Sequence, residues 1–100
     1  MAVAEVSVVP VGTGSPSISR YVARCLDILE ESGLRFELNP MATVVEGDVR
    51  AILDAVARMH EATFDGGAAR VLTTVKIDDR RDKPLTMLGK VEAVRRRRAK

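Results

Sequence analysis

Apolar and polar residues alternate along the first part of the chain, and the spacing becomes helical further on. Residues 2–12 (AVAEVSVVPVG) predict a strand with one buried face and one mixed face. The buried face would carry Ala4, Val6 and Val8. In the turn-forming stretch that follows, Ser15 before Pro16 predicts the start of a helix. Gly33 would end this helix, whose apolar positions are Ile18, Tyr21, Val22, Cys25, Leu26 and Leu29.

Two short strands and a second helix are predicted next. Residues 34–40 and 41–47 have the composition of strands, and Asn39 with the proline after it would connect them. Asp48 is suited to cap a helix that ends in the DGG stretch at residues 65–67. The buried stripe of this helix would consist of Val49, Ile52, Leu53, Val56, Met59, His60 and Phe64.

The last part of the chain predicts a further strand and a third helix. Residues 70–78 (RVLTTVKID) are rich in β-branched residues, which favour strands. Asp82 and Pro84 would open the helix that follows. Its apolar positions are Leu85, Leu88, Val91 and Val94.

The predicted order is β-α-β-β-α-β followed by one more helix. This order is typical of the ferredoxin-like α+β fold, in which two helices cover one face of an antiparallel sheet. We expect residues 1–100 to form one such domain with an extra C-terminal helix. The other sheet face would mix apolar and polar residues, so we expect a second subunit, the third helix or both to cover it. Its residues would be Val3, Glu5, Ser7, Val9, Arg70, Leu72, Thr74 and Lys76.

The composition is that of a folded domain, with 46% hydrophobic and 30% charged residues. No apolar run approaches the roughly 20 residues that span a bilayer. Glu5 and the absence of basic residues near the N-terminus argue against a signal peptide. Cys25 is the only cysteine, so an internal disulfide is excluded. We therefore expect a cytoplasmic protein without a membrane segment.

Charge is distributed unevenly along the chain. Residues 1–50 contain four basic and seven acidic side chains (−3), whereas residues 51–100 contain twelve and seven (+5). Arg95–Arg98 supply much of this excess, although basic residues at the end of a helix also complement its dipole. A basic end is compatible with an anionic partner. The chain has only one Tyr and two Phe, however, which argues against nucleic acid.

Residues 76–83 (KIDDRRDK) combine three acidic and four basic side chains. Two interpretations are open. Local ion pairs and capping by Asp82 could organise the turn after the last strand, although exposed pairs contribute at most about 1 kcal/mol each. Alternatively, Arg80, Arg81 and Lys83 could bind an anion such as phosphate, or contact another subunit.

No catalytic or metal-binding motif is found in the sequence. His60 is the only histidine, which excludes a site with several histidine ligands. It would be either a structural residue of the second helix or part of a pocket wall. Cys25 would be an inert core thiol. We expect no enzymatic activity, no metal and no cofactor, and catalysis by His60 and Glu61 is the weakest alternative.

The end of the third predicted strand offers a different chemistry. Glu46 precedes a turn, where a carboxylate could face a pocket mouth and bind an organic cation or an amino group. It could equally be a solvated strand end. Thr43 and Asn39 are close to it in sequence and could supply neutral hydrogen bonds.

Four stretches of the chain can be considered together: VPVGTGSPSISRYVA, ELNPMATVVEGD, MHEATFDGGAARVLTTVKIDDRRDK and TMLGKVEAV. In their order and spacing they resemble a family of small thiamine-binding proteins. This family was first catalogued as one of unknown function and is related in fold to the YkoF-type proteins. The resemblance extends from about Val6 to Val94.

The resemblance implies a ferredoxin-like fold and subunits that assemble into a dimer of dimers. It also implies a non-catalytic binder of thiamine or a related hydroxymethylpyrimidine. Thiamine has a permanent positive charge on its thiazolium ring and an aminopyrimidine edge. Under this hypothesis Glu46 would partner the charge or the amine, Thr43, Asn39 and Ser7 would contact ring nitrogens, and His60 would line the pocket. The alternative is a regulatory or structural oligomer that binds a phosphate-bearing ligand or partner through its basic residues.

Overall fold

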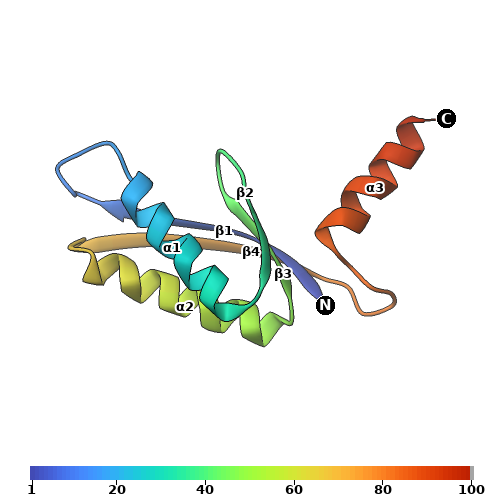
Figure 1. The fold of residues 1–100 in the computed structure, drawn as a ribbon, viewed down its shortest axis with the longest axis horizontal. Coiled ribbons are helices and arrows are strands. Elements are labelled where there is room, and N and C mark those ends of the chain that lie inside the picture. The colour runs from blue at the N-terminus through green and yellow to red at the C-terminus, as the bar shows by residue number, and fades with distance from the viewer. Residues whose placement is uncertain (100) are drawn as a thin grey trace.

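The strands of the protein form one antiparallel sheet in the order β2-β3-β1-β4, seen in a computed structural model that describes residues 1–99 (Figure 1). The expected α+β class is confirmed, and the arrangement is consistent with a ferredoxin-like fold. The elements are β1 (Ala2–Val11), α1 (Ser19–Ser32), β2 (Arg35–Leu38), β3 (Thr43–Gly47), α2 (Val49–Asp65), β4 (Arg70–Asp79) and α3 (Met87–Arg98).

The core lies between one face of the sheet and the helices α1 and α2 (Figure 1). Alternate residues of β1 point into it, as the sequence pattern predicts; they are Ala2, Ala4, Val6 and Val8. Ile28 and Leu29 of α1, Ile52 of α2 and Val45 of β3 are the largest fully buried side chains. The other residues of β1 therefore point to the opposite, open face of the sheet.

The start of α1 differs from the prediction. The helix begins at Ser19 rather than at Ser15 and Pro16, and no side chain caps it. The Ser15 hydroxyl instead accepts a hydrogen bond from the backbone N–H of Ser17, inside the preceding loop. A serine-proline pair thus forms a loop turn here, which has the same local signature as a helix cap. The predicted end of the helix is confirmed, because Gly33 adopts a left-handed conformation with φ of 75°.

Helix α2 begins as predicted, but the face that it buries differs from the predicted stripe by a rotation about the helix axis. The Asp48 carboxylate accepts hydrogen bonds from two backbone N–H groups of the first turn. Leu53 and Phe64, which we expected in the buried stripe, are exposed. The buried residues are Ile52, Ala55, Val56, Met59 and Thr63. The small residues Ala55 and Thr63 belong to this buried face. Hydrophobicity alone does not distinguish such residues from residues on the surface.

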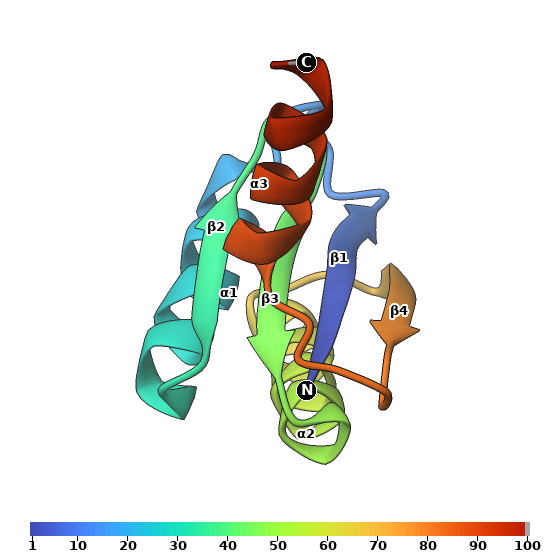
Figure 2. The same cartoon turned by 90° about the vertical axis from the view of Figure 1, so that its right-hand side faces the viewer.

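Helix α3 starts later than predicted and lies on the open face of the sheet, opposite α1 and α2 (Figure 2). Thr86, and not Asp82 or Pro84, caps it, because the Thr86 hydroxyl accepts a hydrogen bond from Gly89 N–H at 3.0 Å. Only its beginning is buried, where Leu85 and Met87 pack with Val3 and Val44. The rest of α3 extends away from the sheet (Figure 1). Within residues 1–99, no helix is long and apolar enough to cross a membrane.

Candidate functional site

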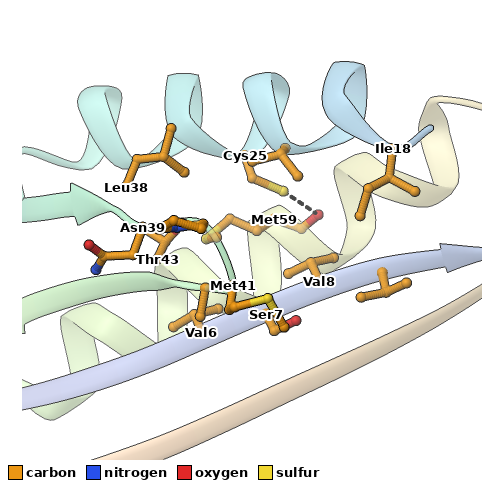
Figure 3. A pocket seen from close by; sticks show the side chains of 14 residues that line it. Val6, Ser7, Val8, Ile18, Cys25, Leu38, Asn39, Met41, Thr43 and Met59 are labelled. Carbon is orange, nitrogen blue, oxygen red and sulfur yellow. Dashed lines mark hydrogen bonds between the residues drawn. The ribbon is translucent and has the colours of Figure 1, made fainter.

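A cavity of about 320 Å³ lies between β1, the first half of α1 and the turn that joins β2 to β3 (Figure 3). This volume is at the lower end of the range of about 300–1,000 Å³ found for small-molecule sites. The lining residues are Val6, Ser7, Val8, Val9, Ile18, Val22, Cys25, Leu38, Asn39, Pro40, Met41, Ala42, Thr43 and Met59.

The strand register creates this cavity. β3 begins at Thr43, opposite Val6, so β1 continues beyond the end of its neighbour. The turn before Thr43 is closed by a hydrogen bond from Asn39 N–H to the Ala42 carbonyl at 3.0 Å. This turn therefore stands beside the free part of β1 and closes one side of the cavity.

Three of the residues that we expected to contact a ligand line this cavity: Ser7, Asn39 and Thr43. The Ser7 side chain is in phase with the open face of the sheet, so Ser7 borders the cavity through its backbone. Asn39 and Thr43 are close in sequence, but Ser7 joins them only through the pairing of β1 with β3. All three are neutral, and among residues 1–99 no charged side chain lines the cavity. The geometry is compatible with their predicted role, which itself stays a prediction.

Thr43 is the most informative of the three. Its side chain is buried, with 6% of the residue exposed. No hydrogen bond joins its hydroxyl to another group within residues 1–99, although every fully enclosed side-chain nitrogen or oxygen in that part of the chain has a partner. The Thr43 hydroxyl must therefore keep some accessible surface, and the cavity that it lines provides it. An accessible hydroxyl without a protein partner, on a residue that is otherwise buried, leaves room for a ligand or water beside it.

Cys25 lies in the cavity wall as well as in the core. Its Sγ is 3.9 Å from both the Met59 carbonyl oxygen and Thr63 Oγ1 (Figure 3 shows the first contact). Burial raises the pKa of the Cys25 thiol, and the contact with Thr63 opposes this only in part. The thiol is thus kept neutral, as expected of an inert core residue. Its position beside a cavity had no signature in the sequence.

Glu46 does not line the cavity, because it points to the open face of the sheet. It is opposite Val3 in the register, one residue out of phase with the core-facing positions. Its Oε1 accepts a hydrogen bond from the backbone N–H of Met87, the first residue of α3, at 3.0 Å. A carboxylate at this place also interacts favourably with the dipole of the helix. The carboxylate that we expected to bind a ligand thus holds α3 on the sheet.

His60 also lies outside the cavity lining. Its Nδ1 is 2.7 Å from Thr73 Oγ1, and its ring packs edge-on to Phe64 with 5.2 Å between ring centroids. These contacts connect α2 to β4 and agree with a structural role. Within residues 1–99, no group of three or more His, Cys, Asp or Glu side chains is placed to hold a metal ion.

The acidic and basic residues after β4 form local pairs. Arg80 donates two hydrogen bonds to Asp82, at 2.6 and 2.9 Å, and Arg81 donates two to Asp79. The Arg80 guanidinium lowers the pKa of the Asp82 carboxyl to about 2. Both arginines therefore already have carboxylate partners. Lys83 lines the same shallow, exposed depression as the two arginines, and anion binding by the three stays a prediction.

The chain matches known proteins over nearly its whole length. A family model described as "Thiamine-binding protein" matches residues 4–95. The UPF0045 protein YqgV of Bacillus subtilis is 43% identical over 98 residues, which cover 94% of each chain. A UPF0045 protein of Methanothermobacter thermautotrophicus is also 43% identical, over 96 residues that cover 95% of this chain and 97% of the relative.

Solved structures are also similar to the chain over nearly its whole length. The hypothetical protein MJ1052 of Methanocaldococcus jannaschii superposes with a TM-score of 0.87 at 38% identity, covering 93% of this chain and 94% of the other. A protein of Thermotoga maritima, assigned provisionally to thiamine biosynthesis or salvage, has a TM-score of 0.76 at 24% identity, with 93% and 97% covered. At that identity the second similarity establishes a shared fold only.

Proposed function

The chain belongs to the thiamine-binding protein family, and on this premise we propose that it binds thiamine or a related hydroxymethylpyrimidine in the cavity beside Thr43, without catalysis. The observation that carries the proposal is Thr43, a largely buried residue that lines the cavity and whose hydroxyl has no protein partner within residues 1–99. Asn39 adds a further neutral hydrogen-bonding side chain to the same wall.

The chemistry of the wall favours one orientation of the ligand. In the part of the chain that the structure describes, no charged side chain lines the cavity, so a buried cationic ring would lose its hydration without gaining a partner. The neutral pyrimidine half of thiamine therefore enters the cavity, and the thiazolium ring stays at its solvent-exposed mouth. The aliphatic residues Val6, Val8 and Leu38 give the pyrimidine a flat apolar environment in place of aromatic stacking.

Self-association is the second part of the proposal. The open face of the sheet exposes Leu72, and α3 exposes Leu88, Val91 and Val94 beyond its buried start. Helix α3 thus covers only part of the face that we expected to be covered. A second copy of the chain packs on these residues to form a dimer, and dimers pair into a tetramer as the family resemblance implies.

Isothermal titration calorimetry with thiamine and with hydroxymethylpyrimidine tests the binding proposal. Micromolar affinity, of the order of −8 kcal/mol, is expected for the folded wild-type protein. Thr43→Val removes the hydroxyl at nearly constant volume and should weaken binding about tenfold. Thr74→Val makes the same change at an exposed position of β4 and should leave binding unchanged. Absence of binding for both compounds in folded protein would overturn the proposal.

A further inference from the structure

The edge of β1 that borders the cavity lacks a neighbouring strand. β1 pairs with β4 from Ala2 to Val11, but with β3 only from Ala2 to Val6. The cavity lining includes Ser7, Val8 and Val9, which lie just beyond the last pair with β3. On this side, backbone groups of β1 are free to pair with something other than a strand.

Pro10 identifies the residues whose backbone N–H and C=O groups point to that side. It lies opposite Val71 of β4 but has no N–H to donate. A proline is accommodated within a sheet where its nitrogen points away from the partner strand. Successive residues of an antiparallel strand direct their polar groups alternately to the two sides. Val8, two residues before Pro10, therefore directs its N–H and C=O to the side of β3 as well.

Val8 is thus a residue with both backbone polar groups directed at the cavity. Its pairing partner in β4 is Thr73, and the pairs of β1 with β3 end at Val6. The phase inferred from Pro10 implies that Val8 and Thr73 exchange no ladder hydrogen bond. No backbone hydrogen bond of the turns, loops and caps within residues 1–99 involves Val8. The residue is buried, and buried backbone groups are nearly always paired.

We propose that the free N–H and C=O of Val8 bind the aminopyrimidine edge of the ligand as a strand-like pair. One residue of a strand edge offers a donor and an acceptor side by side in one plane. A 4-aminopyrimidine offers the complement, a ring nitrogen that accepts next to an amino group that donates. The Thr43 hydroxyl, across the end of β3 from Val8, then serves as a third contact. This inference rests on the proposed function and specifies how the same cavity selects its ligand.

The ligand side can be tested without any mutation. Oxythiamine carries a carbonyl in place of the amino group and an N–H in place of the ring nitrogen, so its edge has the reversed order of donor and acceptor. Calorimetry on wild-type protein should show binding of oxythiamine at least about tenfold weaker than binding of thiamine, because two hydrogen bonds become mismatched. Equal affinities would overturn the inference and leave the proposed function standing.

The protein side needs a variant that removes the Val8 N–H. Val8→Pro removes the N–H but leaves the ladder to β4, which uses Ser7 and Val9 on the other side. Val8→Ala shortens the side chain and keeps the N–H, so it is the matched control. We expect about tenfold weaker thiamine binding for Val8→Pro relative to Val8→Ala. If Val8→Pro does not fold, semisynthetic replacement of Val8 by α-hydroxyisovaleric acid removes the same N–H and keeps the side chain.

Two results separate the failure of this inference from that of the proposed function. If wild-type protein binds neither thiamine nor hydroxymethylpyrimidine, both fail together. If wild-type protein binds thiamine and the Val8 proline or ester variant binds it as tightly as Val8→Ala does, the backbone contact is refuted and the cavity remains the binding site.

Discussion

Glu46 and Met87 are 41 residues apart in the chain, and the Glu46 carboxylate accepts a hydrogen bond from the Met87 N–H at 3.0 Å. This bond joins the middle of the sheet to the first residue of α3. It lies on the open face, whereas the cavity lies on the face covered by α1 and α2. One face of the sheet therefore contacts α3 and the other borders the cavity, so residues of the two faces can be substituted separately.

Glu46→Ala should destabilise the protein and leave thiamine binding unchanged. The residue is only 7% exposed, and loss of a buried charged acceptor leaves the Met87 N–H without a partner. We expect the free energy of unfolding to fall by about 1.5–3 kcal/mol in urea denaturation. Glu37→Ala, an exposed carboxylate on the same sheet face, should change little. A Glu46→Gln variant that is stable but binds thiamine poorly would instead place Glu46 in the ligand site.

Cys25 should react slowly with thiol reagents and more slowly still in the presence of thiamine. Burial raises its pKa, so the reactive thiolate is scarce near neutral pH and the rate should climb only above the usual thiol range. A ligand in the cavity covers the same wall. Alkylation by iodoacetamide, followed by mass spectrometry over a pH series with and without saturating thiamine, measures both effects. Equal rates with and without thiamine would contradict occupancy of this cavity.

His60 and Thr73 should contribute to stability as a pair. Their hydrogen bond of 2.7 Å connects α2 to β4, away from the cavity. We expect His60→Ala and Thr73→Val each to lower the free energy of unfolding by about 1 kcal/mol or more. The double variant should lose less than the sum of the two, by about 0.5–1.5 kcal/mol. Thiamine affinity should stay within a factor of about two. A larger loss of affinity in His60→Ala would indicate that His60 contacts the ligand.

The pattern of the sequence predicts those features that depend on neighbouring residues. The cap at Asp48 and the stop at Gly33 are local, and both are confirmed. The residues Ser7 and Thr43 are far apart, and their meeting depends on the point at which β3 starts pairing with β1. No local pattern contains that register. The family resemblance named Ser7 for the site, and the register brings its backbone beside the cavity while its side chain follows the open face of the sheet.

The partner of Glu46 could not be predicted from its local sequence. A carboxylate at a strand end before a turn has the same local sequence whether it faces a ligand or the N-terminus of a helix. The position of α3 determines which of the two occurs. This helix follows β4 and lies on the open face, where Met87 contacts Glu46. The late start of α3 at Met87, instead of at Pro84, is what makes this contact. An error of one helical turn in the sequence prediction was therefore enough to hide the partner of Glu46.

Charge on the exposed side of α3 should prevent the proposed self-association. Val91 lies between Leu88 and Val94 on the unburied part of the helix. A glutamate there would be buried without a partner if a second copy packs on α3. We expect Val91→Glu to elute as a monomer in size-exclusion chromatography with light scattering, whereas wild-type protein elutes as a larger species. Leu53→Glu, on the exposed side of α2, is the control and should not alter the mass. A wild-type protein that is monomeric at all concentrations would refute the interface.

Asp82 reports whether the arginines after β4 are free for an anion. Its pKa is about 2 in the folded protein, against an ordinary value of 3.8, because Arg80 donates two hydrogen bonds to it. Since the folded-state pKa is lowered, the stabilising effect of the pair is fully present above pH 3.8 and is lost as the pH falls through about 2. Carbon-detected NMR titration of the Asp82 carboxyl should show this low midpoint, and Arg80→Met should return it toward the ordinary value.

The same titration decides between the two interpretations of residues 76–83. Arg81→Met is the control, because Arg81 pairs with Asp79, and it should leave the Asp82 midpoint where it is. An anion that binds Arg80 must displace the Asp82 carboxylate from its two hydrogen bonds, since one guanidinium edge cannot serve both. We expect excess sulfate, with ionic strength held constant by chloride, to leave the midpoint near 2. A sulfate-dependent rise of the Asp82 pKa that is absent in Arg80→Met would show that Arg80 gives up its carboxylate for an anion, and would favour the phosphate-binding alternative.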